Sequence, residues 1–256
     1  MQKRFLCGSC ALLLGLLAAG IPLKAQSESM GTSPVYIYVS QWGVPRAQWG
    51  DMAKLGEEQG AVEDKLLADG TIVGYGHYTN LIHTDGQPTH GGWITATSEG
   101  NVLKALAAFY GAPNLTSPVL AASKHQDIFL RSRMYNKRSG TFDGAYLAGS
   151  IWEVKPGQME NFNAIVKAKV VPILEKELSD GALISYSVDA QDYHTQKRGL
   201  EEVVFVAADA TAVDKVNEAF EAAFSKDTEI GPAFGALTVR GSHRDFLYHV
   251  THMVIK

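Results

Sequence analysis

The feature that most constrains the fold of this 256-residue chain is an internal repeat. Residues 43–109 align without a gap with residues 154–220, 111 positions further on, and 14 of the 67 aligned positions are identical. Unrelated segments of ordinary composition would share about four or five. A duplication therefore explains the match best, and a duplication determines the architecture before any local pattern does.

The N-terminus has the pattern of a secretory signal peptide. Lys3 and Arg4 precede an apolar run at residues 11–19, and small residues follow it. We expect residues 1–25 to be the signal peptide and residues 26–34 a flexible leader, so that the mature protein is periplasmic or secreted. Both cysteines, Cys7 and Cys10, lie within the signal, which leaves the mature chain without a disulfide or a cysteine ligand.

Composition narrows the class of partner. The formal net charge of -4 and the 46% hydrophobic residues are those of an ordinary globular protein. Lys and Arg are scattered rather than gathered into a basic stripe, which argues against a nucleic-acid partner. After the signal, no apolar run approaches the length of a membrane span, about 20 residues. A small molecule is the partner we expect, and the oligomeric state is left open.

Each half shows the same order of predicted elements. In the first half, strands are expected at 35–44, 71–79, 92–97 and 128–135, and helices at 45–68 and 101–109. The last strand recurs at 246–255, where the offset has grown from 111 to 118 residues. The extra seven residues, near 226–235, have the composition of a loop. The sequence thus predicts two repeats, 35–136 and 145–256, joined by a linker at 137–144.

This order is that of the ferredoxin-like βαββαβ unit, in which two helices cover one face of a four-stranded antiparallel sheet. The other face must also be buried, and two such sheets in one chain can bury each other. The predicted fold class is therefore α+β, with two tandem ferredoxin-like repeats packing sheet to sheet as an intramolecular α+β barrel. In element order and duplication the chain resembles the dimeric α+β barrel superfamily, in a fused two-repeat form.

One pair of matched positions differs between the halves in a way that suggests function. Tyr75 and Tyr186 are matched tyrosines of the second strand, but His77 is matched by Val188. A requirement of the fold acts on both copies, whereas an active site can persist in one. We predict that His77 and Tyr75 mark a site in the barrel lumen, with the imidazole as general base or axial ligand. The alternative is an interior histidine bonded to a backbone carbonyl.

Matched aromatic residues complete the predicted ligand site. Trp42 and Trp152 lie in the first strands of the two halves, and such side chains suit a ligand cavity and a core equally. Retention in both halves favours core packing, because a single ligand site rarely needs two copies. The predicted ligand-binding residues are Tyr75, His77, Tyr186, Trp42 and Trp152, with His77 as the one catalytic candidate.

The remaining histidines support metal binding weakly. His77, His83 and His90 are separated by five and six residues, spacings that match no standard zinc signature, so no metal site is predicted. His249 and His252 lie three apart in the last strand, and alternation places them on opposite faces unless a bulge intervenes.

His125 with Asp127 recurs as His243 with Asp245, and a carboxylate near an imidazole can orient it. No Gly-x-Ser-x-Gly nucleophile motif accompanies them, so turns that lead into the last strands are the simpler interpretation.

Three functions fit these patterns. The first is an exported protein that binds a small apolar or aromatic ligand in the barrel cavity. The second follows from the resemblance, because the superfamily includes haem-binding enzymes, cofactor-free monooxygenases and isomerases. It would make the chain a haem-dependent or cofactor-free oxygenase-type enzyme, although no motif supports haem. The third is a non-catalytic interaction module, which predicts a lumen filled by side chains and an exposed apolar patch.

Overall fold

The computed structural model describes residues 35–84, 86–112, 116–193 and 195–256. The predicted signal peptide and leader lie outside these residues. The first half contains β1 (Val35–Gly43), α1 (Trp49–Ala68), β2 (Gly74–Asn80), β3 (His90–Ala96), α2 (Glu99–Tyr110), α3 (Pro118–Ala122) and β4 (Lys124–Lys137). A short 3-10 helix, Arg46–Gln48, leads into α1.

The second half follows β5 (Gly140–Phe142), a three-residue strand within the segment predicted as a linker. It contains β6 (Tyr146–Glu153), α4 (Met159–Ile165), α5 (Val171–Ser179), β7 (Leu183–Tyr193), β8 (Leu200–Ala207), α6 (Ala210–Lys226), α7 (Ile230–Leu237) and β9 (Arg244–Ile255). A π-helical turn, Val166–Val170, joins α4 to α5. The predicted alternation of strands and helices is thus present in both halves.

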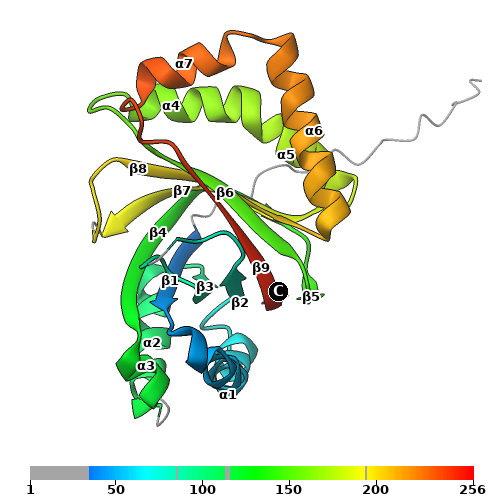
Figure 1. Ribbon diagram of the computed structural model, residues 1–256. Coiled ribbons are helices and arrows are strands. Elements are labelled where there is room, and N and C mark those ends of the chain that lie inside the picture. The colour runs from blue at the N-terminus through cyan, green and yellow to red at the C-terminus, as the bar shows by residue number, and fades with distance from the viewer. Residues whose placement is uncertain (1–34, 85, 113–115, 194) are drawn as a thin grey trace, which may run out of the picture.

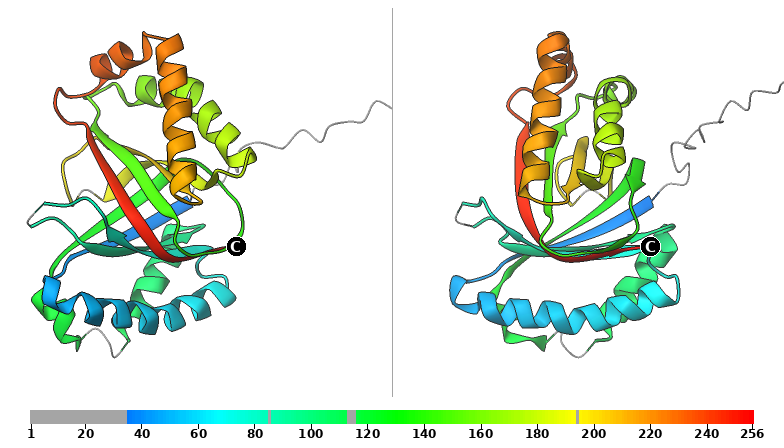
Figure 2. Two further views of the ribbon diagram at one scale, coloured as in Figure 1. Left: turned by 45° about the vertical axis from the view of Figure 1, so that its right-hand side comes forward. Right: turned by 90° about the vertical axis from the view of Figure 1, so that its right-hand side faces the viewer.

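The strands form a closed antiparallel barrel. Their order is β2-β3-β1-β4-β7-β8-β6-β9, and pairing of β9 with β2 closes the ring, while β5 pairs with β9 beside it. The two halves meet along β4 with β7 and along β2 with β9. Helices α1 to α3 cover one side of the barrel and α4 to α7 the other, so the barrel lies between two helical layers (Figures 1 and 2).

Helix ends at matched positions of the sequence have matching caps. Ser98 caps α2 by accepting a hydrogen bond from the Asn101 amide, and Asp209, 111 residues on, caps α6 through the Ala212 amide. Such caps satisfy amides that the first turn leaves without partners. Gly70 and Gly181 follow α1 and α5 with φ of 79° and 82°, a conformation that glycine adopts without steric cost.

The loop predicted near residues 226–235 is wrong, because most of the inserted segment forms α7. Its apolar residues recur at helical spacing, with Ile230 4% exposed and Phe234 one turn later. The Phe234 ring packs 5.5 Å from the Trp152 ring and 5.4 Å from the Phe162 ring. The glycines and proline that suggested a loop are therefore outweighed by burial of one apolar face.

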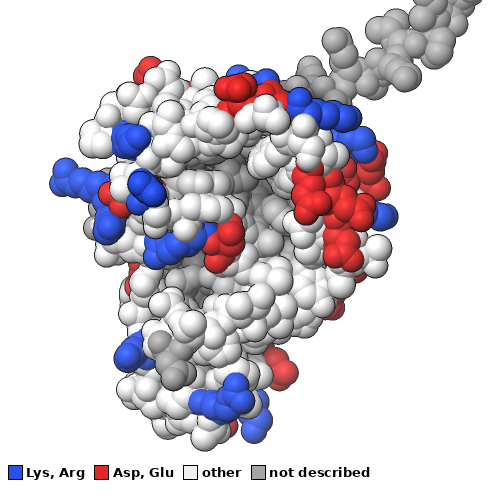
Figure 3. Space-filling view, turned by 45° about the horizontal axis from the view of Figure 1, so that its top comes forward, with Lys and Arg blue, Asp and Glu red and all other residues white. Residues whose placement is uncertain are grey.

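The surface carries both signs of charge. On the face shown in Figure 3, the Lys and Arg side chains are dispersed among Asp and Glu rather than gathered into one stripe. None of the helices in the described residues is both long and apolar enough to span a membrane.

Candidate functional site

The Tyr75 and His77 side chains do not point into the barrel lumen. On β2, a Cβ at Gly76 would come within 2.3 Å of the Trp93 ring, which lines the lumen. Tyr75 and His77 alternate with Gly76 and therefore point to the other face, toward α1. The Tyr75 hydroxyl donates to Asp64 on that helix (2.8 Å). The prediction that His77 lies in the lumen was therefore wrong. Alternation shows which side chains share one face of a strand, but it does not show which face points into the lumen.

The aromatic residues of the prediction also lie on the helix-facing side. Tyr186 donates its hydroxyl proton to Glu175 of α5. The Trp42 ring packs in the cluster around α1 and α3, and Trp152 lies 5.7 Å from the Phe162 ring of α4. Trp42, Tyr75 and His77 therefore gather in the N-terminal half, while Trp152 and Tyr186 lie in the C-terminal half on the far side of the barrel.

A cavity of about 950 Å³ lies between helices α1 and α2 and the strands of the N-terminal half. We call it the helix-side cavity. Its aromatic and apolar wall is made by Tyr38, Trp42, Leu55, Ile94, Leu106 and Tyr110. His77 lies on its strand side, and its Nε2 is 2.7 Å from Oε2 of Glu63, a carboxylate only 3% exposed. A cavity thus does lie beside His77, although not inside the barrel.

Small residues explain why this cavity occurs in the N-terminal half. Gly60 of α1 and Gly92 of β3 line it. The residues 111 positions further on are Val171 and Val203, both 6% exposed within the apolar core beneath α4 to α7. A valine side chain adds three carbons at each position, so the space that is open in one half is filled in the other.

The ionic pair in the cavity has an apolar counterpart. Glu63 is matched by Leu174 and His77 by Val188, and both of these residues are fully buried in the core of the C-terminal half. An ionisable pair at these positions is therefore not required by the fold. This difference extends the asymmetry at His77 to a second residue that sequence reasoning did not single out.

The tyrosines, in contrast, make the same contact in both halves. Tyr75 donates to Asp64, and Tyr186 donates to Glu175, the residue matched to Asp64. Burial, followed by the hydrogen bond to the carboxylate, raises the pKa of both hydroxyls. These bonds tie a helix to a strand in each half, which is a structural role.

His252 joins the cavity because of an irregularity in β9. His77 pairs with His252 and Tyr78 pairs with Val250, so Thr251 is an extra residue. Beyond it, the His252 Nε2 lies 3.4 Å from the Tyr75 hydroxyl, and its Nδ1 is 2.7 Å from Asp143. No sequence signal marks this bulge. The expectation that His249 and His252 face opposite sides holds only for a regular strand, and the bulge lies between these two residues.

The His125–Asp127 pair stands at another part of the cavity wall. His125 stacks on Trp42 (3.8 Å between ring centroids), and its Nε2 contacts both Ser40 Oγ (3.0 Å) and Asp127 Oδ1 (2.8 Å). In a catalytic triad, the two ring nitrogens of the histidine bind different partners. Here Ser40 and Asp127 both contact the same nitrogen, Nε2. Burial alone would raise the pKa of Asp127, but hydrogen bonds from His125 and Tyr38 outweigh it and hold the pKa low.

The C-terminal half contains a corresponding network. His243 stacks on Trp152 (5.0 Å), Asp245 lies 3.0 Å from His243, and Ser150 donates to Asp245 (2.5 Å). Because the cluster occurs twice, it ties the last strand of each half to the first strand. This duplication supports a structural role for the pairs, but His125 and Asp127 lie within β4 and Asp245 within β9, not in turns that lead into these strands.

The other histidines bind nearby polar groups. His83 Nδ1 lies 3.2 Å from the Asn80 carbonyl, and His90 Nδ1 lies 3.0 Å from the Thr89 hydroxyl. Burial, and then the neighbouring His83, lowers the pKa of His90. Within the described residues, no group of three or more His, Cys, Asp or Glu side chains could hold a metal ion.

The helix-side cavity does not suit haem. Among the described residues that line it, five are acidic and none is Lys or Arg: Glu57, Glu63, Asp64, Asp127 and Asp143. The propionate groups of haem are anions and require cationic or hydrogen-bond donating partners. In addition, the Nε2 atom of His77, which an axial ligand would use, is bound to Glu63.

No family model and no curated protein matches this chain. Solved structures that resemble it include a candidate monooxygenase from Lactobacillus acidophilus, with a TM-score of 0.64, 11% identity and coverage of 87% of this chain and 96% of that chain. Another is a candidate monooxygenase from Fusobacterium nucleatum, with a TM-score of 0.63, 9% identity and coverage of 89% of this chain and 96% of that chain. A third is a heme-binding protein from Thermus thermophilus, with a TM-score of 0.53, 11% identity and coverage of 87% of this chain and 94% of that chain.

These likenesses and the closed eight-stranded ring define the fold. The chain has the dimeric α+β barrel fold, as the repeat and the element order predict. At such low identity the likeness reports the fold alone, and the site has to be argued from this chain's own residues.

Proposed function

We propose that the protein binds a small aromatic compound, neutral or cationic, in the helix-side cavity of the N-terminal half. The observation that carries this proposal is the asymmetry of the two halves, in which Gly60 and Gly92 leave a space that Val171 and Val203 fill in the other half. Keeping such a cavity open forgoes packing energy. A cavity retained in one half and filled in the other is more economically explained by a ligand than by the fold.

The lining supports the chemistry of the ligand. Aromatic and apolar side chains dominate the wall, and the charged groups among the described lining residues are carboxylates and histidines. An anionic ligand would be repelled, whereas a hydroxylated aromatic compound could donate to Glu63, Asp143 or the histidines.

We further infer that the barrel consists of two tandem ferredoxin-like repeats. The strands of the first half lie in the order β4-β1-β3-β2, and those of the second half lie in the corresponding order β9-β6-β8-β7. The registers support this, because Tyr75 pairs with Ile94 and Tyr186 with Phe205, both 111 residues further on.

Filling the cavity without touching its polar groups tests the binding proposal. A Cβ at Gly60 would meet no atom within 4 Å, so Gly60→Leu can extend into the cavity. We expect the affinity for the neutral aromatic probe N-phenyl-1-naphthylamine, followed by fluorescence, to fall at least tenfold. Gly50→Leu, on an exposed position of the same helix, is the matched control and should retain affinity. Equal affinity in the two variants would contradict the proposal.

A second candidate function is proton abstraction by His77, as in a cofactor-free oxygenase or isomerase. It is favoured by the contact with Glu63, because an imidazole that donates Nε2–H to a carboxylate keeps Nδ1 as a proton acceptor. Nδ1 lies on the side of Gly56 and Gly92, both lining residues. The pair would thus orient the imidazole and hold it in the tautomer that accepts a proton at Nδ1.

Oxygen consumption with a panel of polycyclic phenols tests this second function. Deprotonation by a positioned base contributes about 10²- to 10⁴-fold to a rate. We therefore expect His77→Gln to reduce any consumption at least 100-fold while leaving the binding of N-phenyl-1-naphthylamine within about threefold. Substitution of His249, whose ring meets the Tyr146 ring edge-on outside the cavity lining, should leave both unchanged. Consumption that survives His77→Gln would rule out His77 as the base.

A further inference from the structure

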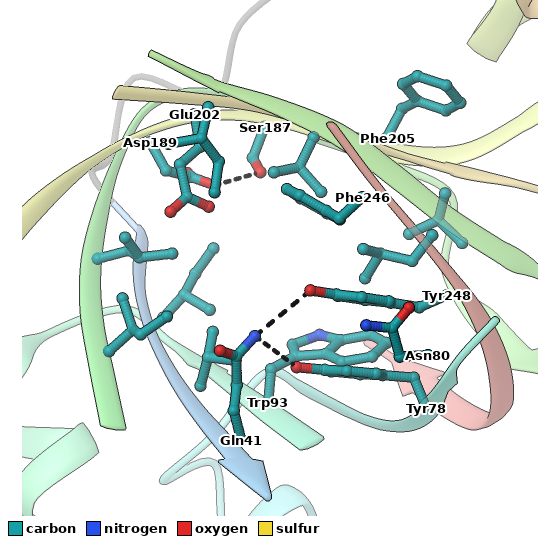
Figure 4. A pocket seen from close by; sticks show the side chains of 18 of the residues that line it. Gln41, Tyr78, Asn80, Trp93, Ser187, Asp189, Glu202, Phe205, Phe246 and Tyr248 are labelled. Carbon is teal, nitrogen blue, oxygen red and sulfur yellow. Dashed lines mark hydrogen bonds between the residues drawn. The ribbon is translucent and has the colours of Figure 1, made fainter. Parts of the chain in front are cut away.

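The barrel lumen holds a second cavity, separate from the helix-side cavity, of about 530 Å³. Figure 4 shows its contents: carboxylates on one side, aromatic rings on the other and apolar side chains between them. The lumen is therefore not filled by side chains, contrary to what an interaction module predicts. Its volume falls in the range of small-molecule sites.

The acidic side is formed by neighbouring residues of β7 and β8. Asp189, 1% exposed, pairs across the strands with Glu202, 9% exposed. Asp189 accepts hydrogen bonds from Ser187 (2.6 Å) and from Ser132. Glu202 accepts none from any described residue, although its side chain is buried and directed toward the cavity (Figure 4). Its carboxyl oxygens are therefore able to accept hydrogen bonds from a ligand in the cavity.

The aromatic side is a stack of rings. Tyr78 and Tyr248 lie 4.3 Å apart and 3° from parallel, and Phe246 stacks on Tyr248 at 5.0 Å. Gln41 fixes the two hydroxyls, with its Nε2 3.1 Å from the Tyr78 oxygen and 3.5 Å from the Tyr248 oxygen. Trp93 lies beside them (Figure 4). The faces of such rings attract organic cations.

These two sides arise at matched positions of the two halves. Tyr78 is matched by Asp189, and Gly91, over which the Tyr78 ring lies, is matched by Glu202. The duplication thus yields a tyrosine over a glycine in one half and an acidic pair in the other, and Tyr248 of β9 completes the ring stack. Neither pair is required by the fold, since each half does without the other's residues.

We propose that the lumen is a second binding site, for an organic cation in which a protonated amine is attached to an apolar or aromatic body. The ammonium group would donate to Glu202 and Asp189, and the body would lie along the ring stack and the aliphatic wall. Among the described residues that line the lumen, Arg244 is the only Lys or Arg. It is exposed at the start of β9 and makes no ion pair with Asp189 or Glu202 in the described structure. The acids are therefore available to a cation.

The titration of these acids provides an additional readout. Burial, and then the neighbouring Asp189, raises the pKa of Glu202 to about 8, and burial raises that of Asp189 to about 6. Arg244 and Glu201 also act electrostatically on Glu202. Tyr78 and Tyr248 lie within electrostatic range of Glu202, and Tyr135 within range of Asp189. A bound cation favours the ionised carboxylates, so binding near pH 7 should release a proton.

Calorimetric titration with 2-phenylethylamine tests the site. Phenylacetate and 2-phenylethanol serve as the anionic and neutral probes of the same body. We expect the amine to bind at least tenfold more tightly than either, and proton release to appear as a dependence of the heat on the ionisation enthalpy of the buffer. The double variant Asp189→Asn with Glu202→Gln should lose at least tenfold in amine affinity, while Glu218→Gln, an exposed acid on α6, should lose none.

Several outcomes would overturn the site. Equal affinity for the amine and phenylacetate would show that the carboxylates do not select charge. Unchanged amine affinity in the double variant would remove the assignment of the two acids. Loss of amine binding in Gly60→Leu would place the amine in the helix-side cavity instead. Folding of each variant is checked by circular dichroism, and Glu202→Gln alone, a replacement of equal size, is the fallback if the double variant does not fold.

Discussion

Replacing Glu63 by leucine and His77 by valine together is expected to give a protein at least as stable as the wild type, whereas either replacement alone is destabilising. The pair is buried on the Glu63 side, at 3% exposure. Removing His77 leaves that carboxylate without its imidazole partner, and breaking a buried ion pair typically costs about 3 to 5 kcal/mol. The double replacement reproduces Leu174 and Val188, which pack in the core of the other half.

Urea denaturation of the four proteins in this cycle gives the free energy of unfolding of each. We expect a coupling energy of at least about 3 kcal/mol between the two positions, because the single replacements are destabilising and the double replacement is not. A double variant less stable than both single variants would show that the pair is needed for folding, and the functional interpretation of the asymmetry would fail.

Glu202→Gln is expected to stabilise the protein at alkaline pH and to leave it nearly unchanged in acid. In the folded protein Glu202 keeps its proton up to about pH 8, whereas the unfolded chain releases it near the ordinary value of 4.5. Between these values the folded state binds more protons, so wild-type stability falls as the pH rises. Glutamine does not titrate, so the variant does not lose this stability. The difference from wild type should reach on the order of 5 kcal/mol near pH 9.

Thermal or urea denaturation of Glu202→Gln and wild type between about pH 4 and pH 9 measures this difference. The difference should grow steadily between the two pKa values and then level off. Glu218→Gln is the control, because Glu218 is exposed on α6 and should show no such trend. A constant difference across the whole range would mean that Glu202 ionises in the folded protein as it does in water.

Much of the fold could be predicted because the duplication restricts it. A repeated order of strands and helices, with Gly70 and Gly181 ending matched helices, leaves few ways to bury both faces of two sheets. The segment at 226–235 was mispredicted because glycine and proline indicate a loop, while the contacts of Phe234 with Trp152 and Phe162 become visible only in three dimensions.

The candidate site was predicted in part. The difference between His77 and Val188 pointed to the half of the chain in which the helix-side cavity lies. His77 borders this cavity, whereas Val188 is packed in the core of the other half. The face could not be predicted, since alternation along β2 is the same whichever side closes the barrel. His252 could not be found either, because the bulge at Thr251 depends on pairing with β2. Asp189 and Glu202 were passed over because acidic residues in strands are ordinarily solvated.

The pairing of β4 with β7 and of β2 with β9 within a single chain has a consequence for how such a protein can change. In a symmetric dimer every substitution appears twice, so a residue that opens a cavity also removes packing from the second copy. Joining the two halves in one chain removes that coupling. One half can give up packing for chemistry while the other supplies the stability that holds the shared barrel together.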